Sequence, residues 1–344
     1  MPRDTIQVAL QTITDTKSVD LTEDTYFALN NGRSVTLMIG DGAPQRLKTT
    51  TSLLPLLNAY GEGTAPGRYA ALLARDTVAE LAVTAPDTPV AEMALEANRR
   101  LSAKLKQVYG ELTVEAVLAQ EPDLTELRDD PRFLRWVLPV SCITIARLDL
   151  LTGRLEYAHG ADTALLAFYK DGRTVQVTPD QMGPHDDKMR REMGRIMAEV
   201  GQNTLETLRP HFEPAFTTNR YNGIFHNYVD EQGRTDPSVG VGVINGLPQL
   251  ESYLVTGALD ANELDALLLC SDGFLWPSVL DETPAQMDAR LAFMRQLIGE
   301  HGLEGYLKLL REEEVSDADG SKYLRFGVHD DSTAIVVAFS VVSA

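Results

Sequence analysis

The stretch ALLLCSDGFLW, residues Ala266–Trp276, decides how this chain is expected to fold. Its first half is apolar, as in a strand that is buried on both faces, and it ends abruptly in Ser271, Asp272 and Gly273. A carboxylate at the end of a core strand is costly unless hydrogen bonds or a cation compensate its charge. Asp272 therefore either caps a turn or holds a positive ion.

The composition of the chain narrows the class of protein. Its 344 residues are 44% hydrophobic, which is enough to build a substantial core. The 50 acidic side chains exceed the 31 Lys and Arg side chains and give a net charge of -19, so a phosphate backbone would be repelled. We therefore expect no nucleic-acid partner and favour divalent cations as ligands.

Sequence features also indicate the compartment. No apolar run reaches the roughly 18 to 20 residues that a membrane-spanning helix needs, and the start MPRDTIQVALQTITD lacks the basic and apolar parts of a signal peptide. Cys142 and Cys270 lie in apolar runs, which favours buried, reduced thiols over a disulfide. We expect a cytoplasmic protein without a membrane partner, and the sequence predicts no oligomeric state.

The first organised unit is EDTYFALNNGRSVTLMIGDG, in which two β-rich runs flank an Asn-Gly dipeptide. That dipeptide favours a hairpin with a two-residue loop, and this register places Glu23 opposite Gly40. The carboxylates of Glu23, Asp24 and Asp41 are then expected at one end of the hairpin.

The rest of the chain alternates between blocks of helices and blocks of strands. Apolar periodicity predicts helices over 66–83, 90–109, 187–200, 284–302 and 304–314, an antiparallel meander over about 141–178, and a last strand over 332–342. No repeat or linker divides the chain, so we expect residues 1–344 to form a single domain with a flap-like insertion at about 180–238. This block order favours a sandwich of antiparallel sheets flanked by helices.

Asp-Gly occurs four times, and the surroundings separate the copies. The pairs that begin at Asp171 and Asp319 lie in polar segments and are interpreted as ordinary turns. Asp41 and Asp272 instead follow apolar strands. A further acidic pair, at residues 330–331, stands immediately before the last strand, so three strands carry carboxylates at their ends.

Turn capping remains open for any single one of these carboxylates, but it explains the whole set less well. Buried like charges raise one another's pKa and destabilise a fold unless a cation neutralises them. Ligands that are all oxygen suit Mg²⁺ or Mn²⁺, and two such ions about 3.5 to 4 Å apart can activate a bridging water. The pattern thus favours a two-metal site whose hydroxide attacks phosphorus.

Five motifs in order, EDTYF, IGDG, AHGADTALLAFYKDG, LLLCSDGF and HDDSTAIVV, resemble the PP2C family of metal-dependent serine/threonine phosphatases, the PPM superfamily, in its bacterial form. The resemblance covers nearly the whole chain. It implies an α+β fold, a four-layer α-β-β-α sandwich of two antiparallel sheets flanked by helices. It also implies a signalling enzyme that binds two Mn²⁺ or Mg²⁺ ions and removes phosphate from Ser or Thr of a phosphoprotein.

The resemblance assigns roles to seven residues. Asp41 would bridge two ions, the Gly42 carbonyl and Glu23 would serve one of them, Asp272 and Asp330 would hold the other, Asp24 would act through water, and Asp162 would contribute to a weak third site. Catalysis would then depend on Asp41, Asp272 and Asp330, around the hydroxide that bridges the ions.

The chain departs from the family pattern at several positions. Val19 stands where many members have an arginine that grips phosphate, Ala43 where animal members have a histidine, and Trp276 where many have an acidic ligand of the third metal. Lys17 or Arg46 could replace the arginine. These departures keep two alternatives open: a PP2C-like regulatory or binding module with weak or no catalysis, and a phosphatase of small phosphoesters.

Three other features are interpreted without a role in catalysis. His185 and His226 lie in the expected flap, and contact with substrate is the less favoured interpretation for each. The apolar stripe along 189–200 is expected to be core packing. The run REEE at residues 311–314 is expected to be a solvated helix face.

Overall fold

Two five-stranded sheets face each other in the computed structural model of the chain, which describes residues 5–16, 22–43, 51–201, 210–211, 225–325 and 327–342. The first sheet has the strand order β1-β12-β11-β6-β7, and all its neighbouring strands are antiparallel. Its strands are β1 (Thr5–Asp15), β12 (Ser332–Val342), β11 (Leu264–Cys270), β6 (Ala164–Tyr169) and β7 (Thr174–Gln176).

The second sheet has the order β10-β5-β4-β3-β2 and is also antiparallel throughout. Its strands are β10 (Val255–Asp260), β5 (Arg154–Gly160), β4 (Ser141–Asp149), β3 (Ser34–Gly42) and β2 (Thr25–Asn30). Together the two sheets form a sandwich whose strands at the centre are almost entirely buried.

The quoted stretch is apolar because β11 is covered on both faces. Side chains alternate between the two faces of a strand. Leu267 and Leu269 pack in the layer between the sheets, whereas Leu268 and Cys270 pack on the outer side against α9 (Pro284–Ser316). The charge of Asp272 therefore follows a strand that has no solvated face.

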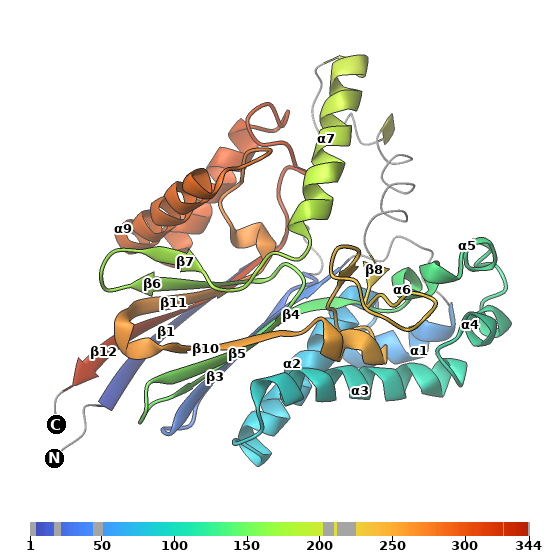
Figure 1. Ribbon diagram of the computed structural model, residues 1–344, viewed down its shortest axis with the longest axis horizontal. Coiled ribbons are helices and arrows are strands. Elements are labelled where there is room, and N and C mark those ends of the chain that lie inside the picture. The colour runs from blue at the N-terminus through green and yellow to red at the C-terminus, as the bar shows by residue number, and fades with distance from the viewer. Residues whose placement is uncertain are drawn as a thin grey trace.

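Helices cover the outer face of each sheet and complete the α-β-β-α order that the sequence predicts (Figure 1). The helices α2 (Pro66–Thr84) and α3 (Val90–Tyr109) lie on the second sheet, and α9 lies on the first. Gly302, with φ 69°, interrupts α9 at the boundary between the two predicted helical runs. The predicted fold class is confirmed.

A further long helix, α7 (Gly183–Val200), rises from the sandwich within the predicted flap (Figure 1). Met189, Met193 and Ile196 are buried along its apolar stripe, as predicted, although Val200 is 40% exposed. Residues 202–209 and 212–224 of the predicted flap lie outside the described residues. The remaining short elements are η1 (Thr51–Leu53), α1 (Leu54–Leu57), η2 (Asn58–Tyr60), α4 (Val114–Gln120), α5 (Glu126–Asp129), η3 (Pro131–Phe133), α6 (Leu134–Val137), β8 (Phe225–His226), β9 (Gly240–Val241), η4 (Pro248–Ser252), η5 (Ala261–Glu263) and η6 (Asp272–Phe274).

The predicted hairpin register is wrong by two residues. Thr25, rather than Glu23, lies opposite Gly40. The turn is longer than two residues because the Asn31 side-chain oxygen accepts hydrogen bonds from the backbone N–H groups of residues 33 and 34. A capping side chain thus outweighs the general preference of Asn-Gly for a tight hairpin.

The predicted meander is also only partly correct. β4 pairs with β5, and β6 pairs with β7, but β5 and β6 belong to opposite sheets. The chain crosses between the sheets at residues 161–163, which puts Asp162 at the crossing. The edge strand β1, which pairs with β12 along its whole length, was not among the predicted elements.

Two other sequence predictions concern the compartment. Cys142 and Cys270 are buried free thiols, as expected. None of the helices in the described part of the chain is both long enough and apolar enough to span a bilayer.

Candidate metal centre

The predicted acidic residues of the first sheet lie at one end of it. Asp272 follows the end of β11, and Asp330 stands just before the start of β12, its antiparallel neighbour. Antiparallel pairing brings the end of one strand beside the start of the next. The same geometry places Asp162 close to this end, because it precedes β6 on the other side of β11.

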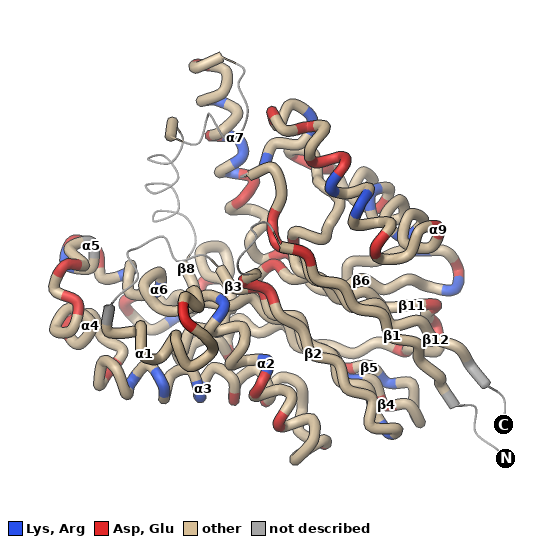
Figure 2. The backbone as a smooth tube through the Cα atoms, turned by 180° about the vertical axis from the view of Figure 1, so that it is seen from behind, with Lys and Arg blue, Asp and Glu red and all other residues tan. Residues whose placement is uncertain are grey.

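The second sheet contributes from the facing layer. Asp41 lies in the last part of β3, opposite Cys142 of β4, while Glu23 and Asp24 stand just before β2. Acidic positions from both sheets accordingly lie around the base of α7 in Figure 2. The structure thus brings together the strand ends that the sequence singled out.

Hydrogen bonds connect the loops that carry these carboxylates. The hydroxyl of Ser271 donates to Asp24 Oδ2 at 2.6 Å, and Ser271 Oγ accepts from the backbone N–H of Thr333 at 2.9 Å. The backbone N–H of Glu23 donates to Asp331 Oδ2 at 2.8 Å. Ser271 and Asp331 therefore tie the start of β2 to the ends of β11 and β12 in the opposite sheet.

Close backbone contacts explain why residues 273 and 42, beside the acidic residues, are glycines. A Cβ atom added to Gly273 would lie 2.0 Å from the carbonyl oxygen of Asp331, so only glycine allows the two acid-bearing loops to approach this closely. A Cβ atom on Gly42 would lie 2.5 Å from the backbone of Gly67, at the start of α2. Both sites need glycine for packing, whatever their carbonyl groups bind.

The carboxylates hold protons more tightly than usual. Burial raises the pKa of Asp24 to about 7; the bond from Ser271 lowers it, while the charges of Asp272, Asp331 and Asp330 raise it further. Burial also raises the pKa of Asp272 to about 7, with the charge of Asp330 adding to the effect. Both pKa values are raised because the ionised form of each carboxylate loses its hydration on burial and is repelled by neighbouring negative charges.

Asp41 and Asp162 show the same effect. Burial, and then the charges of Asp24 and Asp272, raise the pKa of Asp41 well above its usual range. Burial and the charge of Asp272 likewise raise the pKa of Asp162, although a hydrogen bond with Cys142 opposes this. Among the described residues, no Lys or Arg side chain forms an ion pair with these two carboxylates or with Asp24 and Asp272.

The carboxylates are near one another without forming a finished coordination shell. In the ranges that the structure describes, no three side chains of His, Cys, Asp or Glu converge tightly enough to enclose an ion. The carboxylates are thus close enough for their charges to repel one another, but they do not surround a common point. Their placement agrees with the predicted cluster, and their roles as ligands remain a prediction.

Two residues of the site, Arg311 and Glu314, were interpreted wrongly from the sequence, because the side chains of both are largely buried. Arg311 belongs to the run that is expected to be a solvated helix face, but only 17% of its side chain is exposed. Its guanidinium donates to the Asp330 carbonyl oxygen and to Ser332 Oγ, both at 2.7 Å, and forms ion pairs with Asp15 and Glu314. No local signal reveals this role, because the partners come from β1, β12 and the loop before β12.

A cavity of about 880 Å³ opens beside Asp272 and Asp330. Its walls come from the base of α7, the loop after η6, the start of α9 and residues 323–325, 327, 329 and 330. Neither His185 nor His226 lines it. The turns at Asp171, which is exposed, and at Asp319, which is partly buried, are capped by their own side chains, as predicted, and neither residue lines the cavity.

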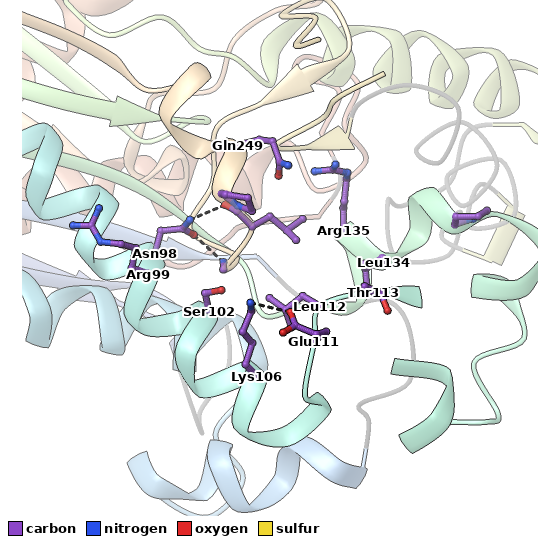
Figure 3. A pocket seen from close by; sticks show the side chains of 14 residues that line it. Asn98, Arg99, Ser102, Lys106, Glu111, Leu112, Thr113, Leu134, Arg135 and Gln249 are labelled. Atoms are coloured by element: carbon purple, nitrogen blue, oxygen red, sulfur yellow. Dashed lines mark hydrogen bonds and ion pairs between the residues drawn. The ribbon is translucent and has the colours of Figure 1, made fainter. Parts of the chain in front are cut away.

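A second cavity, of about 470 Å³, lies on the far side of the second sheet (Figure 3). Asn98 of α3 lines it and holds the turn at residues 245–247 through three hydrogen bonds. Lys106 forms an ion pair with Glu111 on the same wall. It shares no lining residue with the cavity at Asp272, so it is separate from the carboxylates.

Only some of the positions that depart from the pattern of the resembled family lie among the described residues. Ala161, at a position where members of the resembled family usually have a glycine, has φ 72°, a conformation that favours glycine. Trp276 lines the cavity beside Asp272. Val19, Lys17 and Arg46 lie outside the described residues.

No family model and no curated protein matches this chain. Several solved structures do. RsbX in complex with magnesium is 10% identical with a TM-score of 0.45, covering 99% of this chain and 100% of that chain. The catalytic domain of the serine/threonine protein phosphatase PstP with two manganese ions is 16% identical with a TM-score of 0.44, covering 99% and 100%. The phosphatase Stp1 from Staphylococcus aureus is 15% identical with a TM-score of 0.49, covering 100% and 98%.

These solved structures are bacterial phosphatases of the PP2C type, the family that the sequence motifs resemble. The identities and TM-scores are low. Any role for a particular residue of this chain therefore depends on its own geometry.

Proposed function

We propose that this protein is a metal-dependent phosphatase that removes phosphate from phosphoserine and phosphothreonine in proteins. The observation that supports this best is the group of buried carboxylates from both sheets. Asp24, Asp41, Asp162 and Asp272 all have raised pKa values, and none has a basic partner among the described residues. A fold that keeps four such groups together is most simply explained by a cation that offsets their charge.

The donor set fits hard divalent ions. Its members offer carboxylate and carbonyl oxygens, which Mg²⁺ and Mn²⁺ prefer. We assign Asp41, Asp272, Asp330 and Glu23, with the Gly42 carbonyl, as the groups that hold two ions, and Asp24 and Asp162 as outer groups, Asp162 toward a weak third ion. When bound, such ions would supply an activated water and offset the negative charge of the phosphoryl group.

The chain's own residues would orient this centre. Ser271 holds Asp24 at 2.6 Å, and Asp331 holds the backbone of Glu23 at 2.8 Å. In the reaction the oxygen of water forms a bond to phosphorus while the bond from phosphorus to the Ser or Thr oxygen breaks, and that oxygen takes up a proton. Ala43 offers no imidazole to donate the proton, so we expect water to supply it.

Four Asp→Asn variants test the proposal with built-in controls. Asp41→Asn and Asp272→Asn remove negative charge from the centre, and the hydrolysis of a phosphothreonine peptide in saturating Mn²⁺ should fall by at least about 100-fold. Asp171→Asn and Asp319→Asn change turns that do not line the cavity and should retain activity near that of the wild type. Equal activity in all four folded variants would contradict the site assignment.

A regulatory binding module is the second candidate function. The observations that favour it are Val19 and Trp276, which stand where many members of the resembled family have a phosphate-gripping arginine and an acidic ligand of the third metal. Under this alternative the wild-type chain would bind a phosphopeptide but show no turnover with Mn²⁺ or Mg²⁺ across several peptides. A third candidate, hydrolysis of small phosphoesters, predicts turnover of p-nitrophenyl phosphate without turnover of any phosphopeptide.

A further inference from the structure

The cavity beside Asp272 has an apolar wall that the hydrolysis itself does not need. Leu275, Trp276 and Val279 of the loop after η6 form it together with Met287 of α9 and Leu324. The same cavity contains Asp272 and Asp330, so the apolar wall is continuous with the candidate metal centre. A volume of about 880 Å³ also exceeds what a phosphoryl group alone would occupy.

Trp276 is fixed in this wall by contacts on several sides. Its backbone N–H donates to Met294 Sδ at 3.4 Å, and its carbonyl oxygen accepts from Arg290 at 3.1 Å. Its ring meets the ring of Phe293 edge to face, with centroids 5.1 Å apart. The indole is partly exposed, so a rigid aromatic surface is already in place to be covered by an apolar group.

The arginines of the cavity are already neutralised by neighbouring acids. Arg290 pairs with Glu282 at 2.8 Å, and both side chains are only 12% and 13% exposed. Arg190 pairs with Asp187 at 3.0 Å and also donates to Ser278. A third arginine, at position 325, pairs with the carboxylate at position 317. An acidic group that entered the cavity would therefore displace an existing ion pair to find a cation.

Acidic side chains outnumber the arginines along the cavity even when Asp272 and Asp330, whose charges bound ions would offset, are left out. Asp180 lines it beside Asp272 and Asp330, and the charge of Asp180 acts on Asp272. A second acidic group from a ligand would be repelled, whereas an apolar group would cover the tryptophan without a charge penalty.

We propose that the wall formed by Trp276, Val279, Met287 and Leu324 binds an apolar side chain of the phosphoprotein substrate, next to the phosphorylated residue. The enzyme then prefers apolar neighbours over acidic ones. This inference rests on the proposed function and names the substrate class of that same site.

Matched phosphothreonine peptides test the preference. Three peptides carry Leu, Gly or Asp on both sides of the phosphothreonine and are otherwise identical. In the wild-type protein with Mn²⁺, kcat/KM should be about 10-fold higher for the Leu peptide than for the Asp peptide, with the Gly peptide between them. Trp276→Ala should abolish the preference for Leu over Gly, and Trp276→Phe should retain most of it.

Trp136→Phe is the matched control, because Trp136 is the other tryptophan of the chain and does not line this cavity. The ratio between the Leu and Gly peptides should stay at the wild-type value in this variant. Equal kcat/KM for all three peptides in the wild-type protein would overturn the inference and leave the phosphatase proposal standing.

Binding provides a readout that is independent of turnover. Phosphonate analogues of the three peptides cannot be hydrolysed, and their Kd can be measured by calorimetry. The Leu analogue should bind about 10-fold more tightly than the Asp analogue. Tighter binding of the Leu analogue without turnover of any peptide would support the proposed role of the apolar wall and overturn the phosphatase proposal. Equal Kd values for all three analogues would overturn the proposed role of the wall.

Discussion

The guanidinium of Arg311 donates a hydrogen bond of 2.7 Å to the carbonyl oxygen of Asp330. It also donates to Ser332 Oγ, and Ser332 in turn donates to the carbonyl oxygen of Gly273. A single side chain of α9 therefore holds the backbone of both loops that carry the candidate ligands of the first sheet.

Replacing Arg311 should weaken metal binding without removing a ligand. In Arg311→Met the Asp330 loop loses its donor, and outer-layer substitutions of this kind cost about 10- to 100-fold in metal affinity. Calorimetric titration with Mn²⁺ measures the change. Lys308→Met removes an exposed cation from the same helix and should bind Mn²⁺ like the wild type. Wild-type affinity for Mn²⁺ in Arg311→Met would contradict the positioning role of Arg311.

Gly273→Ala should disturb the site more than its size suggests. The added Cβ would lie 2.0 Å from the Asp331 carbonyl oxygen, so one of the two loops must shift. We expect a loss of stability of roughly 1–3 kcal/mol in urea unfolding, together with weaker Mn²⁺ binding. Gly299→Ala is the control: nothing lies within 4 Å of its added Cβ, and it should stabilise the helix by about 0.5–1 kcal/mol. Similar effects of both changes would contradict the close contact.

The stability of the metal-free protein should fall as the pH rises from about 4 to about 7. Burial raises the pKa of Asp24 and Asp272 to about 7, whereas an Asp in the unfolded chain has a pKa near about 3.9. Between these values the folded state keeps protons that the unfolded state has lost, so a rising pH favours unfolding. Urea unfolding in EDTA at several pH values measures this trend.

Asp24→Asn removes one of these titrating groups, so its stability should fall less steeply over the same pH range. Asp171→Asn, at an exposed turn, should leave the slope unchanged. A metal-free stability that stays constant or rises with pH would show that the carboxylates are not held together as described.

Added Mn²⁺ or Mg²⁺ should raise the melting temperature, because an ion that binds only the folded state stabilises it. At 100 times its Kd, the ion contributes about 2.7 kcal/mol. EDTA should reverse the shift, and Asp41→Asn should nearly abolish it. The absence of both a thermal shift and calorimetric binding at millimolar concentrations would contradict the metal centre.

Local patterns alone indicated much of the fold. The helix stripe with Met93, Leu101 and Leu105 is fully buried, and the break of α9 falls between the two predicted runs. The strand before Asp272 also ends where the sequence predicts, whereas β3 continues through Asp41 to Gly42. These features depend on periodicity and on the change from apolar to charged residues, which neighbouring residues in the chain already contain.

Features that depend on distant partners were missed or wrong. The hairpin register differs from the predicted one because the Asn31 side chain caps a longer turn. The predicted meander is split because β5 and β6 belong to opposite sheets. Arg311 looked solvated because Asp15 and Asp330, its partners, approach it only after the sheets and α9 have packed.

The sequence by itself thus determined which residues carry charge at the ends of buried strands. Only the tertiary structure decided that Asp41 and Asp272, from facing sheets, come within range of each other's charge. The physical reason is that strand periodicity is a local property, whereas the distance between two strand ends depends on how the two sheets pack across the core.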